Sequence, residues 1–435
     1  MPQNWRDKPF RWLIAASILH VGLTISIFTI GHFQLIPSTF DANGIGVTFA
    51  TDSIAYRNWA AHMVNVWKSE GISAWAHTQS SLHVRLYSIS FALFGWVLGQ
   101  NILAVEVLNL FYYLGIISFV YLLAKEVFNA RTAFLASVVV GLWPSFLLHT
   151  TQLVRDPISV LCLLIILYLL TLLLKREFAR TSVIWCGIAL STVMTIFWLI
   201  RGNMWNIVVA AILITGVLLI VRMVGQRRFL AGNVAIFLFI SITAVIVPSI
   251  MKSTSMPNIQ SATTAFSIHG AEYVASRRSL ISRLILQLEI RRAAFKVYEG
   301  QASNIDSNVA LRSVGDVLRY LPRAAEIGFF APFPSFWLRG PNFIVSRIES
   351  GLETLVMYVF YAFAAVGIWN ERKRLSMWLI LLVAVVGMVS LGLAVINLGA
   401  LFRLRYFFWI LMIIIAAHGF YEVRRPSGAS ENRVS

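Results

Sequence analysis

The chain has 435 residues, of which 58% are hydrophobic and only 13% are charged. A soluble protein of this length needs far more polar surface, so the composition excludes a soluble protein and predicts a polytopic membrane protein. The net charge of +17 would also suit a nucleic-acid-binding protein, but in a membrane protein we expect it to reflect Lys and Arg retained on the cytoplasmic side.

The first apolar run, near 12–32, follows the basic residues Arg6, Lys8 and Arg11. This run is long for the apolar part of a signal peptide, and it has no evident small-x-small cleavage site. We therefore expect it to be a retained first span that begins on the cytoplasmic side.

The polar segment that follows, from about 33 to 101, contains the most distinctive short stretch of the chain. Thr51 and Asp52 are helix-starting residues, because their side-chain oxygens can accept hydrogen bonds from the free N–H groups of a first turn. Asp52 and Tyr56 are four residues apart, so they share one face of that helix. The sequence thus predicts a helix that carries a carboxylate at its start, and Asp52 either takes part in a reaction or only caps the helix.

Nine further apolar runs are long enough to cross a bilayer, which makes ten spans in all. These runs lie near 102–124, 132–149, 157–174, 182–200, 204–221, 229–250, 351–369, 376–396 and 402–421.

One shorter run, 86–99, is interrupted by Gly95 and Gly99. If it does not cross the membrane, both termini and nearly all the short basic loops lie on one side, as the positive-inside rule requires. If it does cross, every later basic loop falls on the outer side. We therefore expect a juxtamembrane helix at 86–99, in the outer leaflet, and cytoplasmic termini.

These assignments divide the chain into three parts. We expect an N-terminal transmembrane module at 1–250, a large extracytoplasmic loop at 251–350, and C-terminal transmembrane helices with a cytoplasmic tail at 351–435. In the loop, basic residues such as Arg283 and Arg292 alternate with aliphatic ones, a pattern suited to anionic headgroups. The end of the loop, from Tyr320 to Trp337, is rich in Pro and aromatic residues and predicts an interfacial turn.

Under this topology the unusual polar residues gather on the outer side. Charged groups at membrane depth are costly, so they mark a functional site by default. Arginines beside two carboxylates suit an anionic substrate that reacts, because Arg binds phosphate through charge-assisted hydrogen bonds. The candidates are the catalytic residues Asp52 and Asp156 and the substrate-binding residues Tyr56, His83, Arg85, Arg155, Arg201, Arg403 and Arg405.

Several of these residues also have a purely structural interpretation. Asp156 precedes Pro157 and can simply begin a helix. Arg201 and Arg403 can extend to lipid headgroups. A single His such as His83 at an interface is more often structural than catalytic.

Five motifs occur in a characteristic order and on characteristic sides of the membrane. They are Asp52 with Tyr56 and Ala60 in the first outer segment; His83-Val84-Arg85-Leu86-Tyr87 followed by Leu93-Phe94-Gly95; the cytoplasmic Leu122-Leu123-Ala124-Lys125-Glu126-Val127-Phe128; Asp156 at the start of the fourth span; and Arg201-Gly202 after the fifth.

In this order and sidedness the chain resembles the GT-C glycosyltransferases, membrane enzymes that use polyprenyl-phosphate sugars and include protein O-mannosyltransferases and the lipid A aminoarabinose transferase. The resemblance covers most of residues 40–205. It implies an all-α polytopic fold with about ten transmembrane helices and outer juxtamembrane helices. Ser53 stands where many members carry a second acid, and Arg201 replaces a more usual Lys, which leaves the acceptor and any metal dependence open.

The resemblance also implies a reaction. A sugar would pass, with inversion, from a polyprenyl-phosphate donor to a glycan, lipid or protein acceptor at the outer face of the plasma membrane. Asp52 would be the base and Asp156 would orient the acceptor, while Arg201, Arg403 and Arg85 would hold the carrier phosphate.

No cofactor and no nucleic-acid partner are expected. The two cysteines, Cys162 and Cys186, fall inside apolar runs, so no disulfide framework or metal motif is implied.

Two other functions stay open at this point. An O-antigen or exopolysaccharide polymerase or ligase would also combine many spans with functional Arg and His, but would use pyrophosphate-linked glycans. A lipid-linked sugar flippase would carry its charged sites near the midplane, often with internal repeats. We find no internal repeat, and the charges fall at the outer edge.

Overall fold

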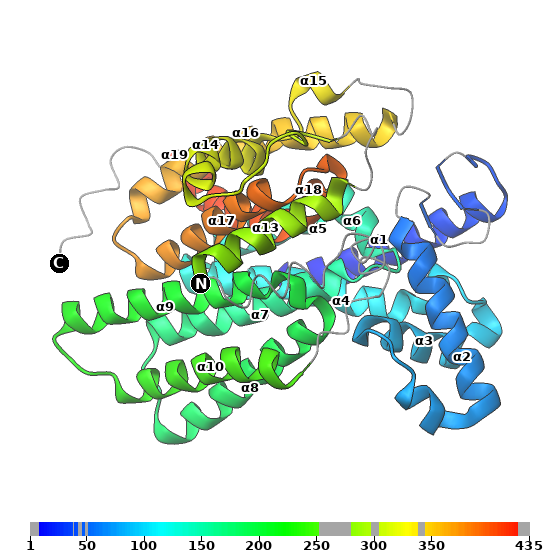
Figure 1. The fold of residues 1–435 in the computed structure, drawn as a ribbon, viewed down its shortest axis with the longest axis horizontal. Coiled ribbons are helices and arrows are strands. Elements are labelled where there is room, and N and C mark those ends of the chain that lie inside the picture. The colour runs from blue at the N-terminus through cyan, green and yellow to red at the C-terminus, as the bar shows by residue number, and fades with distance from the viewer. Residues whose placement is uncertain are drawn as a thin grey trace. The chain divides into compact units, whose positions relative to one another are not determined.

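The computed structural model describes residues 8–37, 39–41, 46–47, 51–251, 280–296, 304–337 and 344–424. These residues form helices joined by short connections (Figure 1). The described ranges contain no strand beyond two isolated bridges, Phe40–Val47 and Asn304–Asn397. The predicted all-α class is therefore confirmed.

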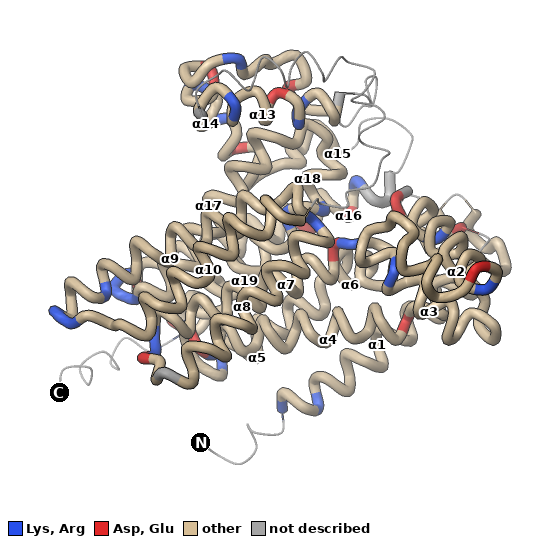
Figure 2. The backbone as a smooth tube through the Cα atoms, turned by 60° about the horizontal axis from the view of Figure 1, so that its bottom comes forward, with Lys and Arg blue, Asp and Glu red and all other residues tan. Residues whose placement is uncertain are grey.

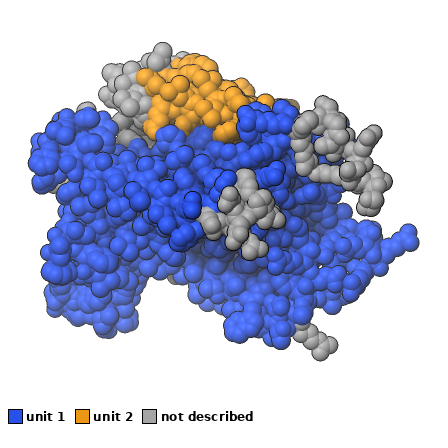
Figure 3. Space-filling view, turned by 180° about the vertical axis from the view of Figure 1, so that it is seen from behind, with its two compact units in different colours: residues 1–255, 363–380, 413–435 blue, residues 256–362, 381–412 orange. Residues whose placement is uncertain are grey.

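The chain divides into two compact units, which Figure 3 colours separately. Unit 1 contains residues 1–255, 363–380 and 413–435, and unit 2 contains residues 256–362 and 381–412. The three long C-terminal helices contribute residues to both units. This division cuts across the expected boundaries at 250 and 350, and the three functional modules stay a prediction.

Most of unit 1 comes from the first 250 residues. Its helices are α1 (Lys8–His32), α2 (Thr51–His77), α3 (Leu82–Leu98), α4 (Ile102–Val127), α5 (Ala130–Gly141), α6 (Pro144–Thr150), α7 (Asp156–Lys175), α8 (Arg180–Arg201), the 3-10 turn η2 (Gly202–Met204), α9 (Trp205–Gln226) and α10 (Ala231–Ile250).

In the described residues, eight helical stretches are long and apolar enough to cross a membrane, or nine if the bent pair α5 and α6 forms one span. One stretch, at 181–226, contains the non-helical residue Arg201, which separates α8 from α9. Both α8 and α9 pack against α7. The chain is thus a multi-pass membrane protein with about eight to nine apolar membrane-spanning helices in its described residues, and the number of ten spans stays a prediction.

Helices α4 and α7 form the centre of unit 1. Helix α4 packs against α1, α3, α5 and α7, and it begins where the Asn101 side chain accepts a hydrogen bond from the N–H of Leu103. Helix α7 is apolar on every face and buried along nearly its whole length, which is the pattern of a central helix. In unit 1, charged residues gather at the helix ends and are rare between them (Figure 2).

Helices α2 and α3 pack against each other. Helix α3 has 17 residues, fewer than the ~20 that a spanning helix needs. A helix at 86–99 was predicted and is present; its location in the outer leaflet stays a prediction. Helix α2 is kinked at Gly71, whose φ of 88° favours glycine.

Unit 2 is described over α13 (Leu280–Lys296), α14 (Val314–Phe330), α15 (Pro334–Trp337), α18 (Leu398–Leu404) and parts of α16 (Ile344–Glu371), α17 (Leu375–Ala394) and α19 (Tyr406–Val423).

The predicted interfacial turn from Tyr320 to Trp337 is wrong in its first half, because α14 continues through Pro322. A capping box starts this helix: the Ser313 side chain accepts from the N–H of Asp316, and the Asp316 carboxylate accepts from the N–H of Ser313. Burial of one helix face, which includes Tyr320 and Ala324, then outweighs the penalty of an internal proline.

Arg292 on α13 does not lie on a surface as the basic pattern predicts. Its side chain is buried and donates hydrogen bonds to the carbonyl oxygens of Leu393 (2.7 Å) and Asp306 (3.0 Å) within unit 2.

Candidate active site

A buried ion pair joins two of the predicted site residues in unit 1. Pro157 in the first turn favours a helix start at Asp156, because proline has no N–H and its φ is already helical. Arg201 is the last residue of α8. Its Nη1 lies 2.5 Å from Oδ1 of Asp156, and the two side chains are only 4% and 6% exposed. Arg201 therefore does not extend to lipid headgroups.

Beside this pair, three aromatic side chains connect α2, α3 and the residues just before α7. The ring of Tyr56 meets that of His83 edge to face, with 4.5 Å between ring centroids, and both side chains are buried. Tyr87, one turn further along α3, donates a hydrogen bond from its hydroxyl to the carbonyl oxygen of Val154 (2.8 Å). This bond fixes the backbone immediately before Arg155 and Asp156.

Arg155, Asp156 and Arg201 act electrostatically on both Tyr56 and His83, and Asp52 acts on Tyr56 as well. Desolvation, followed by the positive charge of Arg155, lowers the pKa of His83 to about 3, although Asp156 opposes the shift. His83 is therefore a neutral imidazole at physiological pH. Desolvation also raises the pKa of Tyr56, and the charges of Arg155, Asp52, Asp156 and Arg201 all act on it.

Asp52 lies in the first turn of α2, where the helix dipole favours a carboxylate. Its side chain is half-buried, whereas Asp156 is buried and paired with Arg201. Of the two predicted carboxylates, Asp52 is thus the more accessible to an incoming acceptor.

Arg155 is half-buried, and its Nε is enclosed without a hydrogen-bond partner among the described residues. Arg155, Arg201 and Asp156 together carry one net positive charge in a place where solvent is largely excluded. One positive charge beside an accessible carboxylate is suited to hold a phosphate group.

The other three predicted ligands are Arg85 in unit 1 and Arg403 and Arg405 in unit 2. Arg85 donates to the carbonyl oxygens of Ala76 (3.0 Å) and Thr78 (2.7 Å) at the end of α2. In unit 2, Arg405 is fully buried, donates to the carbonyl oxygens of Gly328 and Ala331, and packs on the ring of Trp409. Arg403 is half-buried in α18. Substrate contacts by these three arginines stay a prediction.

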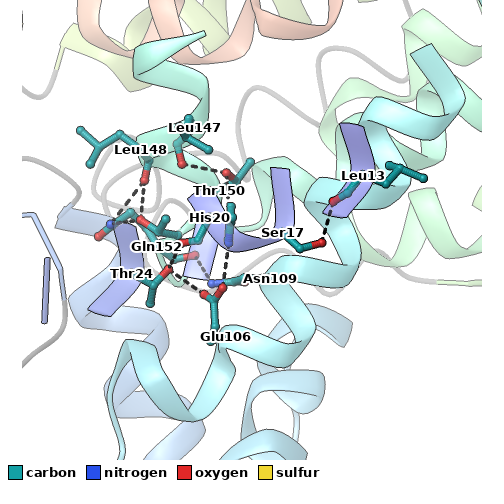
Figure 4. A network of polar contacts seen from close by, with 11 residues as sticks. Leu13, Ser17, His20, Thr24, Glu106, Asn109, Leu147, Leu148, Thr150 and Gln152 are labelled. Carbon is teal, nitrogen blue, oxygen red and sulfur yellow. Dashed lines mark hydrogen bonds and ion pairs between the residues drawn. The ribbon is translucent and has the colours of Figure 1, made fainter. Parts of the chain in front are cut away.

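The structure also shows a polar network that the sequence analysis missed (Figure 4). The His20 ring, buried in α1, contacts the Glu106 carboxylate through Nδ1 (2.8 Å) and the Thr150 hydroxyl through Nε2 (3.2 Å). Thr24 donates to the other Glu106 oxygen (2.7 Å). Both His20 and Glu106 interrupt apolar runs, and a charged residue within such a run is the signal that could have found them.

Within the described ranges, no group of three or more His, Cys, Asp or Glu side chains is arranged to hold a metal ion.

Comparison with proteins of known structure identifies the fold of this chain. No protein-family model matches the sequence, and no curated protein matches it. The structure is similar to that of the archaeal oligosaccharyltransferase AglB from Archaeoglobus fulgidus in complex with an inhibitory peptide and a dolichol-phosphate, with a TM-score of 0.50 and 13% sequence identity. The apo form of an Archaeoglobus fulgidus oligosaccharyltransferase gives a TM-score of 0.47 and 12% identity.

In both comparisons the match covers 95% of this chain and 50% of the other, so the chain spans about half the length of these neighbours. At such low identity the likeness to AglB shows the fold alone. AglB has a GT-C fold, and the predicted GT-C-like architecture is therefore confirmed.

Proposed function

We propose that this chain is an integral membrane glycosyltransferase that transfers a sugar from a polyprenyl-phosphate donor to a glycan, lipid or protein acceptor at the outer face of the membrane. The observation that carries the proposal is the buried Asp156–Arg201 pair next to Arg155, with Asp52 one turn before Tyr56 on α2 and His83 against the Tyr56 ring, on a fold shared with a protein solved with a dolichol-phosphate.

Arg155 is the group we assign to the carrier phosphate. In the proposed reaction, the bond between the anomeric carbon and the phosphate oxygen breaks, and its electron pair leaves with the polyprenyl phosphate. This leaving group is already a stable anion, so it needs a fixed positive charge more than a strong acid. Arg155 supplies that charge, while Arg201 is held in place by Asp156.

Asp52 is the group we assign to the acceptor. The acceptor hydroxyl loses its proton as its oxygen bonds to the anomeric carbon, and a positioned carboxylate can accept that proton. A single displacement of this kind inverts the anomeric centre. Asp52 suits this role because it is half-buried in the first turn of α2, whereas the Asp156 carboxylate is occupied by Arg201.

The test is sugar transfer by the purified Asp52→Asn protein in nanodiscs. The donors are labelled undecaprenyl-phosphate hexoses and pentoses, and membranes from cells that lack the protein supply acceptors. Asn keeps the shape of Asp and also favours helix starts, so thermal stability should hardly change. Turnover should fall on the order of 10²–10⁴-fold if general-base catalysis is lost.

Asp316→Asn is the matched control, because Asp316 also lies in the first turn of a helix but belongs to unit 2. Its turnover should equal that of the wild type. Near-wild-type turnover by Asp52→Asn would remove Asp52 from the mechanism. Transfer from pyrophosphate-linked glycans alone would indicate a polymerase or ligase, and translocation of the donor without transfer would indicate a flippase.

A further inference from the structure

We infer that Gln152 is a positioning residue that fixes the segment leading into Asp52 against the segment leading into Asp156, with the buried His20–Glu106 pair as its support. The inference rests on the proposed function for its catalytic consequence. Its structural part, a single side chain that joins two loops, stands on the contacts alone.

Gln152 lies in the short connection between α6 and α7 and is fully buried. Its Oε1 accepts a hydrogen bond from the N–H of Val47 (3.0 Å), a residue that precedes α2 by only a few positions. Its Nε2 donates to the Thr151 hydroxyl (2.7 Å). The Gln152 amide therefore binds the segment before α2 through Oε1, while Nε2 is held within its own connection before α7.

The residue before Val47 shows how closely the two segments approach. Gly46 has a φ of 115°, a conformation that favours glycine. A Cβ added to Gly46 would overlap the amide oxygen of Gln152. Glycine at this position therefore lets the backbone of the first outer segment lie directly on the Gln152 side chain.

The connection between α6 and α7 is also held at every second residue. Thr150 contacts His20 (3.2 Å), the carbonyl oxygen of Gln152 accepts from the side chain of Asn109 (3.2 Å), and that of Val154 accepts from Tyr87 (2.8 Å). The contacts come from α1, α4 and α3. The residue that follows this series is Arg155, so the anchored connection delivers Arg155 and Asp156 to the site.

The His20–Glu106 pair gives Thr150 a fixed partner. The Thr150 hydroxyl, which contacts Nε2 of His20, also donates to the carbonyl oxygen of Leu147 (2.8 Å). Nδ1 of His20 lies 2.8 Å from a Glu106 oxygen. The ring orientation is thereby determined at both nitrogens, and Figure 4 shows His20 between Glu106 and Thr150.

Apolar side chains could occupy the positions of these polar residues with the same hydrophobic burial. They would not fix the orientation of the backbone segments that they contact. Hydrogen bonds between buried groups are directional, and a buried group left unsatisfied carries the full cost of its desolvation. A displacement of about 1 Å at a reacting centre can lower a rate on the order of 10²-fold. The hydrogen-bonded side chains of His20, Glu106, Thr150 and Gln152 are therefore suited to hold the segments that lead into Asp52 and Asp156 in fixed positions.

The experiment compares Gln152→Met with the wild type. Met has a similar volume but cannot accept from Val47. Hydrogen–deuterium exchange in nanodiscs should speed up in peptides that contain residues 46–47 and in those that contain 150–156. The kcat for labelled undecaprenyl-phosphate sugar should fall on the order of 10²-fold, with the donor KM within about twofold, because a displaced but intact Arg155 still binds phosphate.

Gln226→Met is the matched control, since Gln226 is an exposed Gln at the end of α9; exchange in both segments and kcat should equal the wild-type values. Gln152→Glu, which keeps the acceptor oxygen, should restore the exchange protection of residues 46–47.

Faster exchange in 150–156 alone, or an unchanged kcat despite faster exchange in both segments, would overturn the inference. If the wild type transfers no sugar, the proposed function fails, and the exchange data still decide whether Gln152 joins the two segments.

Discussion

Nη1 of Arg201 lies 2.5 Å from Oδ1 of Asp156, although the two residues are 45 positions apart in the sequence. The pair joins the end of α8 to the start of α7, which is buried along nearly its whole length. Each charge is therefore the counter-ion that makes burial of the other tolerable. In the proposed reaction this pair gives a division of roles, in which Asp156 orients Arg201 and Asp52 is assigned to the acceptor.

The two members of this pair should be energetically coupled. Asp156→Asn or Arg201→Gln leaves a buried charge without its counter-ion and should lower stability by about 3–5 kcal/mol. The double variant should lose less than the sum of the two single variants. Thermal unfolding of the three purified proteins in nanodiscs measures this coupling, and strictly additive losses would contradict a direct pair.

The next prediction separates the roles of two arginines. Arg155→Gln should weaken binding of undecaprenyl phosphate with little change in thermal stability, because the Arg155 side chain is only half-buried. Arg85→Gln should lower stability instead, because it removes both hydrogen bonds to the end of α2. Affinity for undecaprenyl phosphate in detergent measures the difference. Weaker binding by Arg85→Gln alone would return the phosphate role to Arg85.

His83 should make the protein less stable in mild acid. It begins α3, outside the candidate spans, and burial lowers its pKa to about 3, whereas an unfolded chain takes up this proton near pH ~6.5. The stabilising contribution is thus complete above pH ~6.5 and is lost as the pH falls towards 3, by up to about 1.4 kcal/mol per pH unit.

The measurement is the Tm between pH 4.5 and 7.5 for the wild type and His83→Gln. The variant should show the shallower decline, because Gln does not titrate. His77→Gln removes an exposed histidine from the end of α2, and its curve should follow that of the wild type. Parallel curves for the wild type and His83→Gln would show that His83 does not have the lowered pKa.

Two glycines in unit 1 lie where α16 and α19 are in tight contact. A Cβ on Gly419 would overlap the carbonyl oxygen of Phe363, and a Cβ on Gly367 would come within 2.7 Å of the carbonyl oxygen of Ile415. Gly419→Ala should therefore lower the free energy of unfolding by about 1–3 kcal/mol. Gly225→Ala is the control, because a Cβ there meets nothing within 4 Å. Equal Tm values for both variants would show that α16 and α19 can move apart to accept the added methyl group without a loss of stability.

Most of the spans and the two helices α2 and α3 could be predicted from the sequence because hydropathy and turn chemistry are local. Asp52 at the start of α2 and Asp156 at the start of α7 follow from helix-starting residues. The direct pair between Asp156 and Arg201 does not follow, because charge patterning gives the side of the membrane and not the reach of a side chain.

The contact between Gln152 and Val47 could not be predicted for a different reason. Gln152 is uncharged, and its partner on Val47 is a backbone N–H, which every residue but proline carries. His20 and Glu106 were detectable as polar residues within apolar runs. Their partnership was not, because it depends on how α1 lies against α4.

The bend of 68° between α5 and α6 has a consequence for the depth of the chemistry. Helix α5 has 12 residues, so it rises only about 18 Å at 1.5 Å per residue, and the seven residues of the steeply inclined α6 add about 4 Å. A bilayer's hydrocarbon core is about 30 Å thick. Arg155 and Asp156, which follow this short ascent, are therefore expected to lie below the plane of the surrounding headgroups. In the proposed reaction an acceptor has to descend to this level, whereas a lipid-borne phosphate needs only a small downward displacement to reach it.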